Sequence, residues 1–151
     1  MAEISTAAPD PLIAAFFAVE MQGKVKGVFR ELGGLGSETE VTEHQASDSK
    51  GAQVVKMVPG RLKWTPITLK QGITTDKAFW DWRYDVEIGD MEKARKNGSL
   101  VMFDSQGKEA ARWDFVNAWP SKITGPQANA TQSSIAIEEL QIVHEGVKRV
   151  K

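Results

Sequence analysis

The chain has 151 residues and a mass of 16.6 kDa, which suits one domain built around one hydrophobic core. Its 19 basic and 20 acidic residues give a net charge of -1, so the overall charge does not favour binding to nucleic-acid phosphates or to anionic lipid. Cysteine is absent, which excludes disulfides and Cys-based metal sites, and a hydrophobic fraction of 41% favours neither disorder nor a membrane span.

The first residues are predicted to form a flexible arm over 1–11, because they are small, polar and interrupted by prolines. They lack the basic start and the long apolar run of a signal peptide, which predicts production in the cytoplasm. One domain is expected over 12–151, since no internal repeat or linker divides that stretch.

Residues 16–31 are predicted to form a β-hairpin, because apolar residues alternate with others on both sides of a Gln-Gly-Lys turn at 22–24. The stretch 37–46 also alternates but is very polar. We therefore expect a strand that faces solvent, or a wet surface formed by assembly. Residues 46–53 are predicted to be a protruding polar loop.

Strand-like alternation returns over 54–73 and is followed by the one predicted helix. Thr74 or Thr75 can cap the start of this helix, and Gly89 can end it early. Apolar residues at i, i+3 and i+7 give it one core-facing side. These residues are Phe79, Trp82 and Val86.

A second hairpin is predicted around residues 105–107, and its second strand holds two of the five tryptophans. On a regular strand, even spacing places four residues on one face, and Pro120 is expected to end the strand pairing. We expect this face to pack against the helix rather than to stack on nucleic-acid bases, because no basic groove accompanies it. The four residues are Trp113, Phe115, Asn117 and Trp119.

Residues 135–150 are predicted to form one closing strand, so the chain is expected to be mainly β with one helix. No catalytic, cofactor or metal site is expected. His44 and His144 lie 100 residues apart without metal-ligand spacing, and structural or solvent-facing roles suit them better. The GGLGS stretch at 33–37 lacks the lysine of a phosphate-binding loop, and the acidic residues at 81–90 are expected on the solvated side of the helix.

Five stretches of the sequence resemble, in order and spacing, the tail tube proteins of contractile phages and of phage-tail-like contractile injection systems. The similarity covers nearly the whole chain, from about Asp10 to Val147. The stretches are VPGRLKWTPITLKQGIT at 58–74, FWDW at 79–82, KNGSLVMFD at 96–104, WDFVNAWPSKITGP at 113–126 and AIEELQIVHEG at 136–146.

The resemblance implies an Hcp-like fold, in which two packed antiparallel sheets form a small barrel with the helix on its flank. It implies a structural protein rather than an enzyme. Subunits would close into hexameric rings, neighbouring strands would join into one β-barrel around a lumen, and stacked rings would form a hollow tube. Contraction of a surrounding sheath would then drive the tube through a target envelope.

The partners implied by the resemblance are other copies of the chain, the sheath protein, the baseplate or spike, and the terminal cap. Effector proteins or DNA are the cargo that a lumen of this kind would hold. The implied localisation is assembly in the cytoplasm, followed by incorporation into a virion or a phage-tail-like particle that is released outside the cell.

By the same resemblance, the segment from Ser47 to Met57 corresponds to an extended loop that reaches the adjacent subunit or the next ring. Its expected interface residues are Ser47, Asp48, Ser49, Lys50, Gly51, Ala52, Gln53, Val54, Val55, Lys56 and Met57. The aromatic residues expected to pack in the core are Trp64, Phe79, Trp82, Trp113, Phe115 and Trp119.

A second interpretation is a secreted effector or a small-ligand binding module that uses the same barrel, because a fold does not determine a function. Enzymatic turnover that is lost on mutation of His44 or His144 would favour it.

Overall fold

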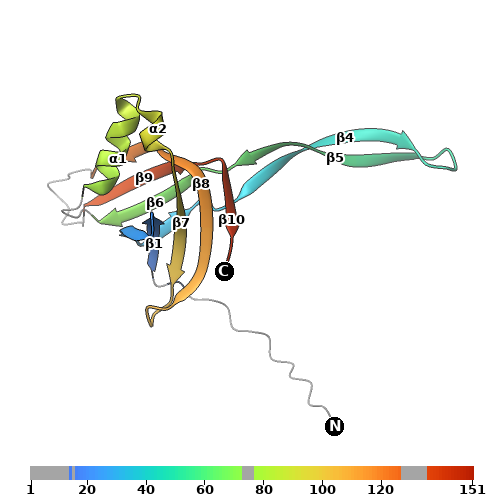
Figure 1. Cartoon of the computed structure of the whole chain (residues 1–151). Helices are drawn as coiled ribbons and strands as arrows, with labels where there is room; N and C mark the ends of the chain where they lie inside the picture. The colour runs from blue at the N-terminus through green and yellow to red at the C-terminus, as the bar shows by residue number, and fades with distance from the viewer. Residues whose placement is uncertain (1–13, 15, 73–76, 127–135) are drawn as a thin grey trace, which may run out of the picture.

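The computed structural model of the chain describes residues 14, 16–72, 77–126 and 136–151. It shows a mainly β body with two helices and a long hairpin that projects away from it (Figure 1). The predicted arm at 1–11 and the predicted caps Thr74 and Thr75 lie outside the described residues. The strands are β1 (Phe16–Met21), β2 (Lys24–Phe29), β3 (Glu31–Gly33), β4 (Ser37–Ser47), β5 (Gln53–Trp64), β6 (Ile67–Gly72), β7 (Lys96–Phe103), β8 (Glu109–Thr124), β9 (Ile137–Val143) and β10 (Gly146–Arg149), and the helices are α1 (Ala78–Glu87) and α2 (Met91–Ala94).

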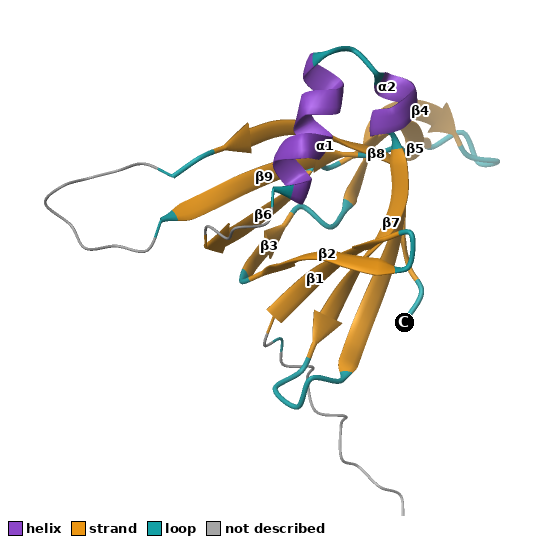
Figure 2. Cartoon of the chain, turned by 60° about the vertical axis from the view of Figure 1, so that its left-hand side comes forward, coloured by secondary structure: helices purple, strands orange, loops and turns teal. Residues whose placement is uncertain are grey.

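Strand β8 joins the body together because it belongs to two sheets. Its first part pairs with β7 on one side and with β10 on the other, and its last part pairs with β9. Strands β1 and β2 extend the first sheet beyond β7, and strands β6 and β3 extend the second beyond β9. Figure 2 shows the two sheets fanning apart, with α1 beside the place where they meet.

The two predicted hairpins are confirmed, but the predicted closing strand is wrong. The chain turns at Gln22 and Gly23 between β1 and β2, and at 104–108 between β7 and β8. The stretch at 135–150 contains two strands instead of one, because the chain leaves β9 at His144 and Glu145. It then returns along β8 as β10.

The bend in β8 lies at Asn117, whose φ is 47°. Asparagine tolerates this left-handed conformation better than most residues. Its backbone N–H donates to Asn97 Oδ1 at 2.9 Å, and its Nδ2 donates to Glu145 Oε2 at 2.8 Å. These two hydrogen bonds hold the bend in place.

The bend also shifts the alternation of side chains along β8. Phe115 and Ala118 are both buried, whereas Asn117 between them is exposed. The prediction that Trp113, Phe115, Asn117 and Trp119 share one face is therefore wrong beyond Phe115. Pro120 does not end the pairing either, because it is buried within β8 opposite Ile142.

The two sheets do not close into a barrel within one chain. Joined through β8, their strands run in the order β2-β1-β7-β8-β9-β6-β3, which leaves β2 and β3 at the two ends. Arg30 joins these strands, and its N–H donates to Lys70 O at 3.1 Å. The predicted class, mainly β with antiparallel sheets, is confirmed, but the small closed barrel is not formed.

Two helices replace the single predicted helix, because the chain is interrupted at Gly89. Glycine adopts its φ of 83° without a steric penalty, as at many helix ends. The N–H groups of Ile88 and Gly89 donate to Tyr84 O and Val86 O, which closes α1. The Asp90 side chain then caps α2 by accepting a hydrogen bond from the N–H of Lys93.

The core gathers residues from both sheets and from α1. Phe79 packs edge-on against Phe29, with ring centroids 5.4 Å apart. Trp82 is 3% exposed, and its Nε1 donates to Ala94 O at the end of α2. The other members of the core cluster are Val19, Met21, Ile67, Leu69, Leu100, Phe115, Ala118, Leu140 and Ile142.

Polar contacts fasten these elements at the surface of the core. Arg83 Nη1 donates to Pro120 O at 3.0 Å, which ties α1 to β8. Arg112 on β8 reaches across β7 to Glu20 on β1, with its Nη1 at 2.8 Å from Glu20 Oε2. The pKa of Arg112 is raised above its ordinary value, because Glu109 and Glu20 accept hydrogen bonds from its guanidinium group.

Candidate subunit interface

Strands β4 and β5 form the hairpin that projects from the body in Figure 1. Their antiparallel register runs from Ser37 opposite Trp64 to Ser47 opposite Gln53. Within the described residues, the two strands pair only with each other. Every residue in them is exposed except Ala46 and Trp64, which are half-buried. The predicted polar strand at 37–46 is therefore confirmed as part of an exposed hairpin.

The polar loop predicted at 46–53 forms the tip of the hairpin but is shorter than expected, a turn over 48–52. Strand β4 continues to Ser47 and β5 begins at Gln53. Asp48 Oδ1 holds the turn by accepting hydrogen bonds from the N–H groups of Lys50 and Ala52, each at 2.8 Å. The segment expected to reach a neighbour, from Ser47 to Met57, thus consists of this turn and the outer part of β5.

One face of the hairpin carries an apolar stripe along β5, with Thr39, Glu43 and Gln45 of β4 beside it. Residues that lie opposite each other in an antiparallel pair point to the same face, and so do alternate residues along a strand. The register therefore places five apolar side chains together, all of them exposed. We call this set the apolar face: Val41 (65% exposed), Val55 (57%), Met57 (63%) and Leu62 (51%), together with Pro59.

The opposite face of the hairpin is mainly polar, although Ala46, Val54 and Val58 also lie on it. Lys63 Nζ lies 3.1 Å from Glu40 Oε1 on this face, and both side chains are exposed. An exposed ion pair of this kind contributes little to stability, so its main effect is to keep the face compatible with water. We call this set the polar face: Glu38, Glu40, Thr42, His44, Lys56 and Lys63.

The hairpin is thus an amphipathic element without a covering layer. A single two-stranded hairpin is at best marginally stable in water, and exposed sheet edges readily pair with other chains. Isolated exposed apolar residues are ordinary on a protein surface, but a continuous apolar stripe marks a surface for interaction. The geometry of β4 and β5 therefore suits contact with another molecule.

The base of the hairpin is fixed to the body. Thr65 N–H donates to Gly36 O at 3.1 Å, which ties together the inner ends of the two strands. The rings of Trp64 and His144 lie 5.7 Å apart, and His144 Nε2 lies 3.2 Å from Thr65 O. His44 lies out on the polar face, so the structure does not bring the two histidines together.

The six aromatic residues expected in the core occupy different environments. Phe79, Trp82 and Phe115 are buried members of the core cluster. Trp113 is partly buried against that cluster, and the guanidinium carbon of Arg149 lies 5.7 Å from its ring centroid. Trp64 and Trp119 are half-buried.

Sequence reasoning missed the inner half of the apolar face. Val41, Pro59 and Leu62 were not expected at an interface, although they continue the alternation that begins at Val55 and Met57. The signal was obscured because β5 contains an extra residue opposite Glu40, where the register shifts. Because of this bulge, the next residue on the same face after Pro59 is Leu62, three positions later instead of two.

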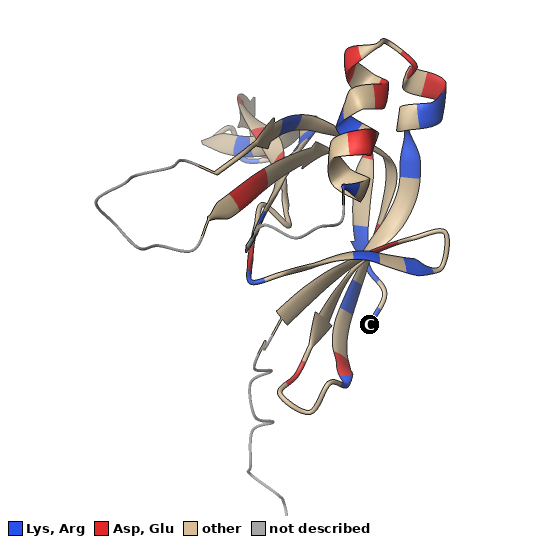
Figure 3. Ribbon diagram, turned by 90° about the vertical axis from the view of Figure 1, so that its left-hand side faces the viewer, with Lys and Arg blue, Asp and Glu red and all other residues tan. Residues whose placement is uncertain are grey.

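Two of the three acidic residues of α1 have ion-pair partners. Asp85 Oδ1 lies 3.7 Å from Lys93 Nζ, and Glu87 Oε1 lies 3.7 Å from Arg83 Nε. Figure 3 shows acidic and basic residues interspersed over the helices and strands in that view. Among the described residues, no cluster of three or more His, Asp or Glu side chains is arranged to hold a metal ion. None of the described helices combines the length and the apolar character needed to cross a bilayer.

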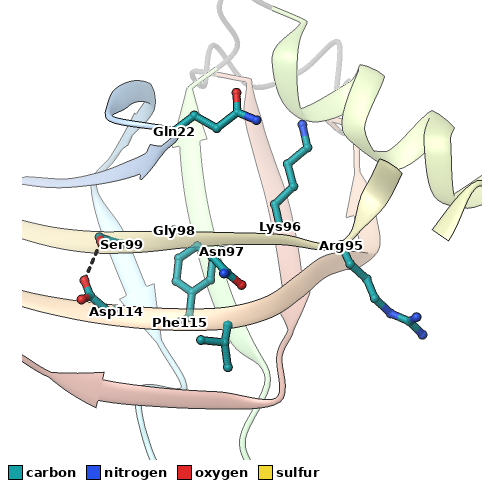
Figure 4. A pocket seen from close by; sticks show the side chains of 9 residues that line it. Gln22, Arg95, Lys96, Asn97, Gly98, Ser99, Asp114 and Phe115 are labelled. Atoms are coloured by element: carbon teal, nitrogen blue, oxygen red, sulfur yellow. Dashed lines mark hydrogen bonds between the residues drawn. The ribbon is translucent and has the colours of Figure 1, made fainter. Parts of the chain in front are cut away.

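An open groove of about 650 Å³ lies between the β1–β2 turn and the start of β7 (Figure 4). Its contacts are structural: Ser99 Oγ donates to Asp114 Oδ1 at 2.6 Å, and no histidine stands beside this pair among the lining residues. A serine nucleophile needs a general base that accepts its proton and is itself oriented by a third group. The groove lacks that arrangement. Its lining residues are Gln22, Arg95, Lys96, Asn97, Gly98, Ser99, Asp114, Phe115 and Val116.

Solved structures show the same fold as this chain. The cap that terminates the tube of the anti-feeding prophage matches with a TM-score of 0.77 and 22% identity, covering 97% of this chain and 95% of that one. A chain of the sheath-tube complex of the extracellular contractile injection system PVC matches with a TM-score of 0.74 and 23% identity, covering 92% and 90%. Hcp1 from Flavobacterium johnsoniae matches with a TM-score of 0.52 and 14% identity, covering 89% and 94%.

Comparison with curated protein sequences gave no match. The family model described as T4-like virus tail tube protein gp19 matches residues 14–148, which include both sheets, the helices and the projecting hairpin. The Hcp-like class predicted from the sequence is thereby confirmed along with the family. The chain belongs to the T4-like virus tail tube protein family.

Proposed function

We propose that this chain is the subunit of the inner tube of a contractile tail or injection system. Copies of the chain close into hexameric rings, the rings stack into a hollow tube, and contraction of the sheath drives that tube through a target envelope. Membership of a structural family supports this role and argues against an enzyme. The observation that carries the proposal is the exposed amphipathic hairpin, which finds no third strand among the described residues.

The interface in this proposal includes the segment from Ser47 to Met57, which contacts the adjacent subunit or the next ring. Its distance from the body in Figure 1 supports this assignment, since the tip reaches well beyond the core of its own chain. Each contact between subunits is modest, but a subunit held by several neighbours at once gains stability through effective concentration. The predicted arm at 1–11 and the tube domain at 12–151 belong to the same proposal.

The other partners follow from the place of the tube in such a particle. The sheath protein surrounds it, the baseplate or spike begins it, and the cap ends it. Relatives of the same fold occur in a sheath-tube complex, a baseplate and a tube cap, which supports these partners. Effector proteins or DNA would occupy the lumen. Assembly takes place in the cytoplasm, before the particle is released outside the cell.

Electron microscopy of the purified full-length protein tests this function. We expect rings at high protein concentration, and tubes when the protein is produced together with its sheath and baseplate. A chain that stays monomeric under every assembly condition, with or without those partners, would contradict the proposal. Enzymatic turnover lost on mutation of His144 would instead support the effector interpretation.

A further inference from the structure

The projecting hairpin is joined to the body by two short connections. Residues 34–36 lead from β3 into β4, and Thr65 and Pro66 lead from β5 into β6 (Figure 1). Within the described residues, β4 and β5 pair with no strand of the body. The direction in which the hairpin leaves the body therefore depends on the contacts at these two connections.

We propose that His144 is the positioning residue that sets this direction before the chain meets another copy. Its Nε2 atom lies 3.2 Å from Thr65 O, and its ring centroid lies 5.7 Å from that of Trp64, the last residue of β5. One side chain of the body thus contacts both the end of β5 and the connection that follows it. This inference rests on the proposed tube function, in which the hairpin meets other subunits.

His144 is itself held in place by the bend in β8. It lies between β9 and β10, and the residue that follows it, Glu145, forms two hydrogen bonds with β8. The N–H of Glu145 donates to Val116 O at 3.0 Å, and its Oε2 accepts a hydrogen bond from Asn117 Nδ2 at 2.8 Å. The histidine therefore holds the hairpin from a fixed point of the body.

The two ring nitrogens of His144 have different surroundings. The carbonyl oxygen of Thr65 can only accept a hydrogen bond, so Nε2 is the donor and carries the proton of the neutral ring. The other nitrogen, Nδ1, is buried and has no hydrogen-bond partner among the described residues. A buried polar atom without a partner costs stability. A residue that served packing alone would be apolar, so we assign the role of His144 to the bond from Nε2.

The connection on the other side leaves the base of the hairpin little room to move. Gly34 has a φ of 85°, and a Cβ atom added to it would clash with Pro66 O. Glycine is the residue that accepts both this conformation and this close approach. The ring of Pro66 fixes its own φ and favours an extended conformation for Thr65. The two connections therefore lie in direct contact, next to the bond from His144.

A hairpin with one direction favours assembly. A neighbouring copy then meets it in a single orientation, and less conformational freedom is lost when the contact forms. Removing the bond from His144 to Thr65 leaves the core cluster intact, since neither residue belongs to it. The change should therefore let the hairpin take many directions and raise the concentration needed for assembly.

Distances between two spin labels test this role in the monomer. The chain contains no cysteine, so Ser49→Cys at the hairpin tip and Gln106→Cys in the β7–β8 turn can be labelled selectively. Double electron–electron resonance of the labelled parent should give one narrow distance distribution. His144→Phe, and His144→Ala if it folds, should broaden the distribution because they lack a donor for Thr65 O. His144→Gln should keep it narrow, since its amide nitrogen can donate from the position of Nε2.

Two further measurements separate positioning from a general structural role. Urea unfolding of His144→Phe should show no loss of stability, because this variant keeps a ring and removes the buried nitrogen without a partner. The concentration for half-maximal ring formation should nevertheless rise roughly tenfold, as one lost hydrogen bond would predict. His44→Ala, at the exposed histidine of the hairpin, is the control and should change neither quantity.

Three results would overturn the inference. They are a broad distance distribution in the parent monomer, a distribution that stays narrow in His144→Phe, and failure of His144→Gln to keep the narrow distribution. A parent chain that never forms rings would instead overturn the proposed tube function, because the distances in the monomer are measured without assembly.

Discussion

Trp82 shows how a single side chain fixes the position of both helices. Its ring is buried in the core cluster, and its Nε1 bonds to Ala94 O across the break at Gly89. Both α1 and α2 are therefore anchored through one residue. The sequence predicted the burial of Trp82 from helical spacing, but it did not predict the hydrogen bond, because the spacing says nothing about where a second helix returns.

Replacing Trp82 by alanine should lower the free energy of unfolding by about 3–5 kcal/mol, since a large aromatic side chain leaves a cavity in the core. Tyr84→Ala is the matched control in the same helix, and it should change stability by no more than about 0.5 kcal/mol because Tyr84 is 59% exposed. Urea unfolding followed by circular dichroism measures both. Equal effects at the two positions would mean that α1 presents a different face to the core.

Asn117 explains why alternation failed as a guide to β8. A regular strand places alternate residues on one face, but one residue with a φ of 47° resets the pattern. The residues next to Asn117 in the sequence do not distinguish it from a solvent-facing asparagine in a straight strand. Its partners Asn97 and Glu145 are distant in sequence, so the bend is a product of tertiary contacts.

At the scale of elements, turn residues in the sequence predicted the two hairpins of the body. Alternation predicted the polar first strand of the projecting hairpin. These signals are local, since glycine and polar residues set the turn and alternation sets the strand. Strand endings were harder to predict. Strand β4 extends to Ser47, and the closing strand divides at His144, because long-range pairing decides where each strand stops.

The two faces of the hairpin are expected to differ in their effect on assembly. Val55→Ser with Met57→Ser should leave the stability of the monomer unchanged within about 0.5 kcal/mol, because both side chains are already exposed to water. The same double variant should weaken ring formation, since it removes apolar surface that a neighbour would cover. Sedimentation velocity over a concentration series measures the weakening.

His44→Ser with Val58→Ser is the matched control on the other side of the hairpin. It removes a similar amount of side chain from the same hairpin, on the face opposite to the apolar face. Rings should form as in the parent chain. If this control weakens assembly as strongly as the change at Val55 and Met57, the apolar face has no special part in the contact.

At the scale of the whole molecule, the core is complete within one chain, but the projecting hairpin has no covering layer in the described structure. The sheets and α1 bury one core cluster within one subunit, whereas the hairpin leaves its apolar face and both its edges in water in the described structure. Composition and patterning could predict the first part. They could indicate the exposed hairpin only as a strand that is unusually polar. The sequence around the hairpin does not show which surface of another molecule would cover it.

Amide hydrogen exchange of the parent protein, compared between its monomeric and assembled forms, tests most directly whether other copies complete the hairpin. In the monomer, we expect the amides of β4 and β5 whose N–H groups point to the outer edges to exchange rapidly, and those of β7 and β8 slowly. Assembly should slow exchange at both outer edges of the hairpin and leave the body unchanged. Rapid exchange at these edges in assembled particles would contradict the account.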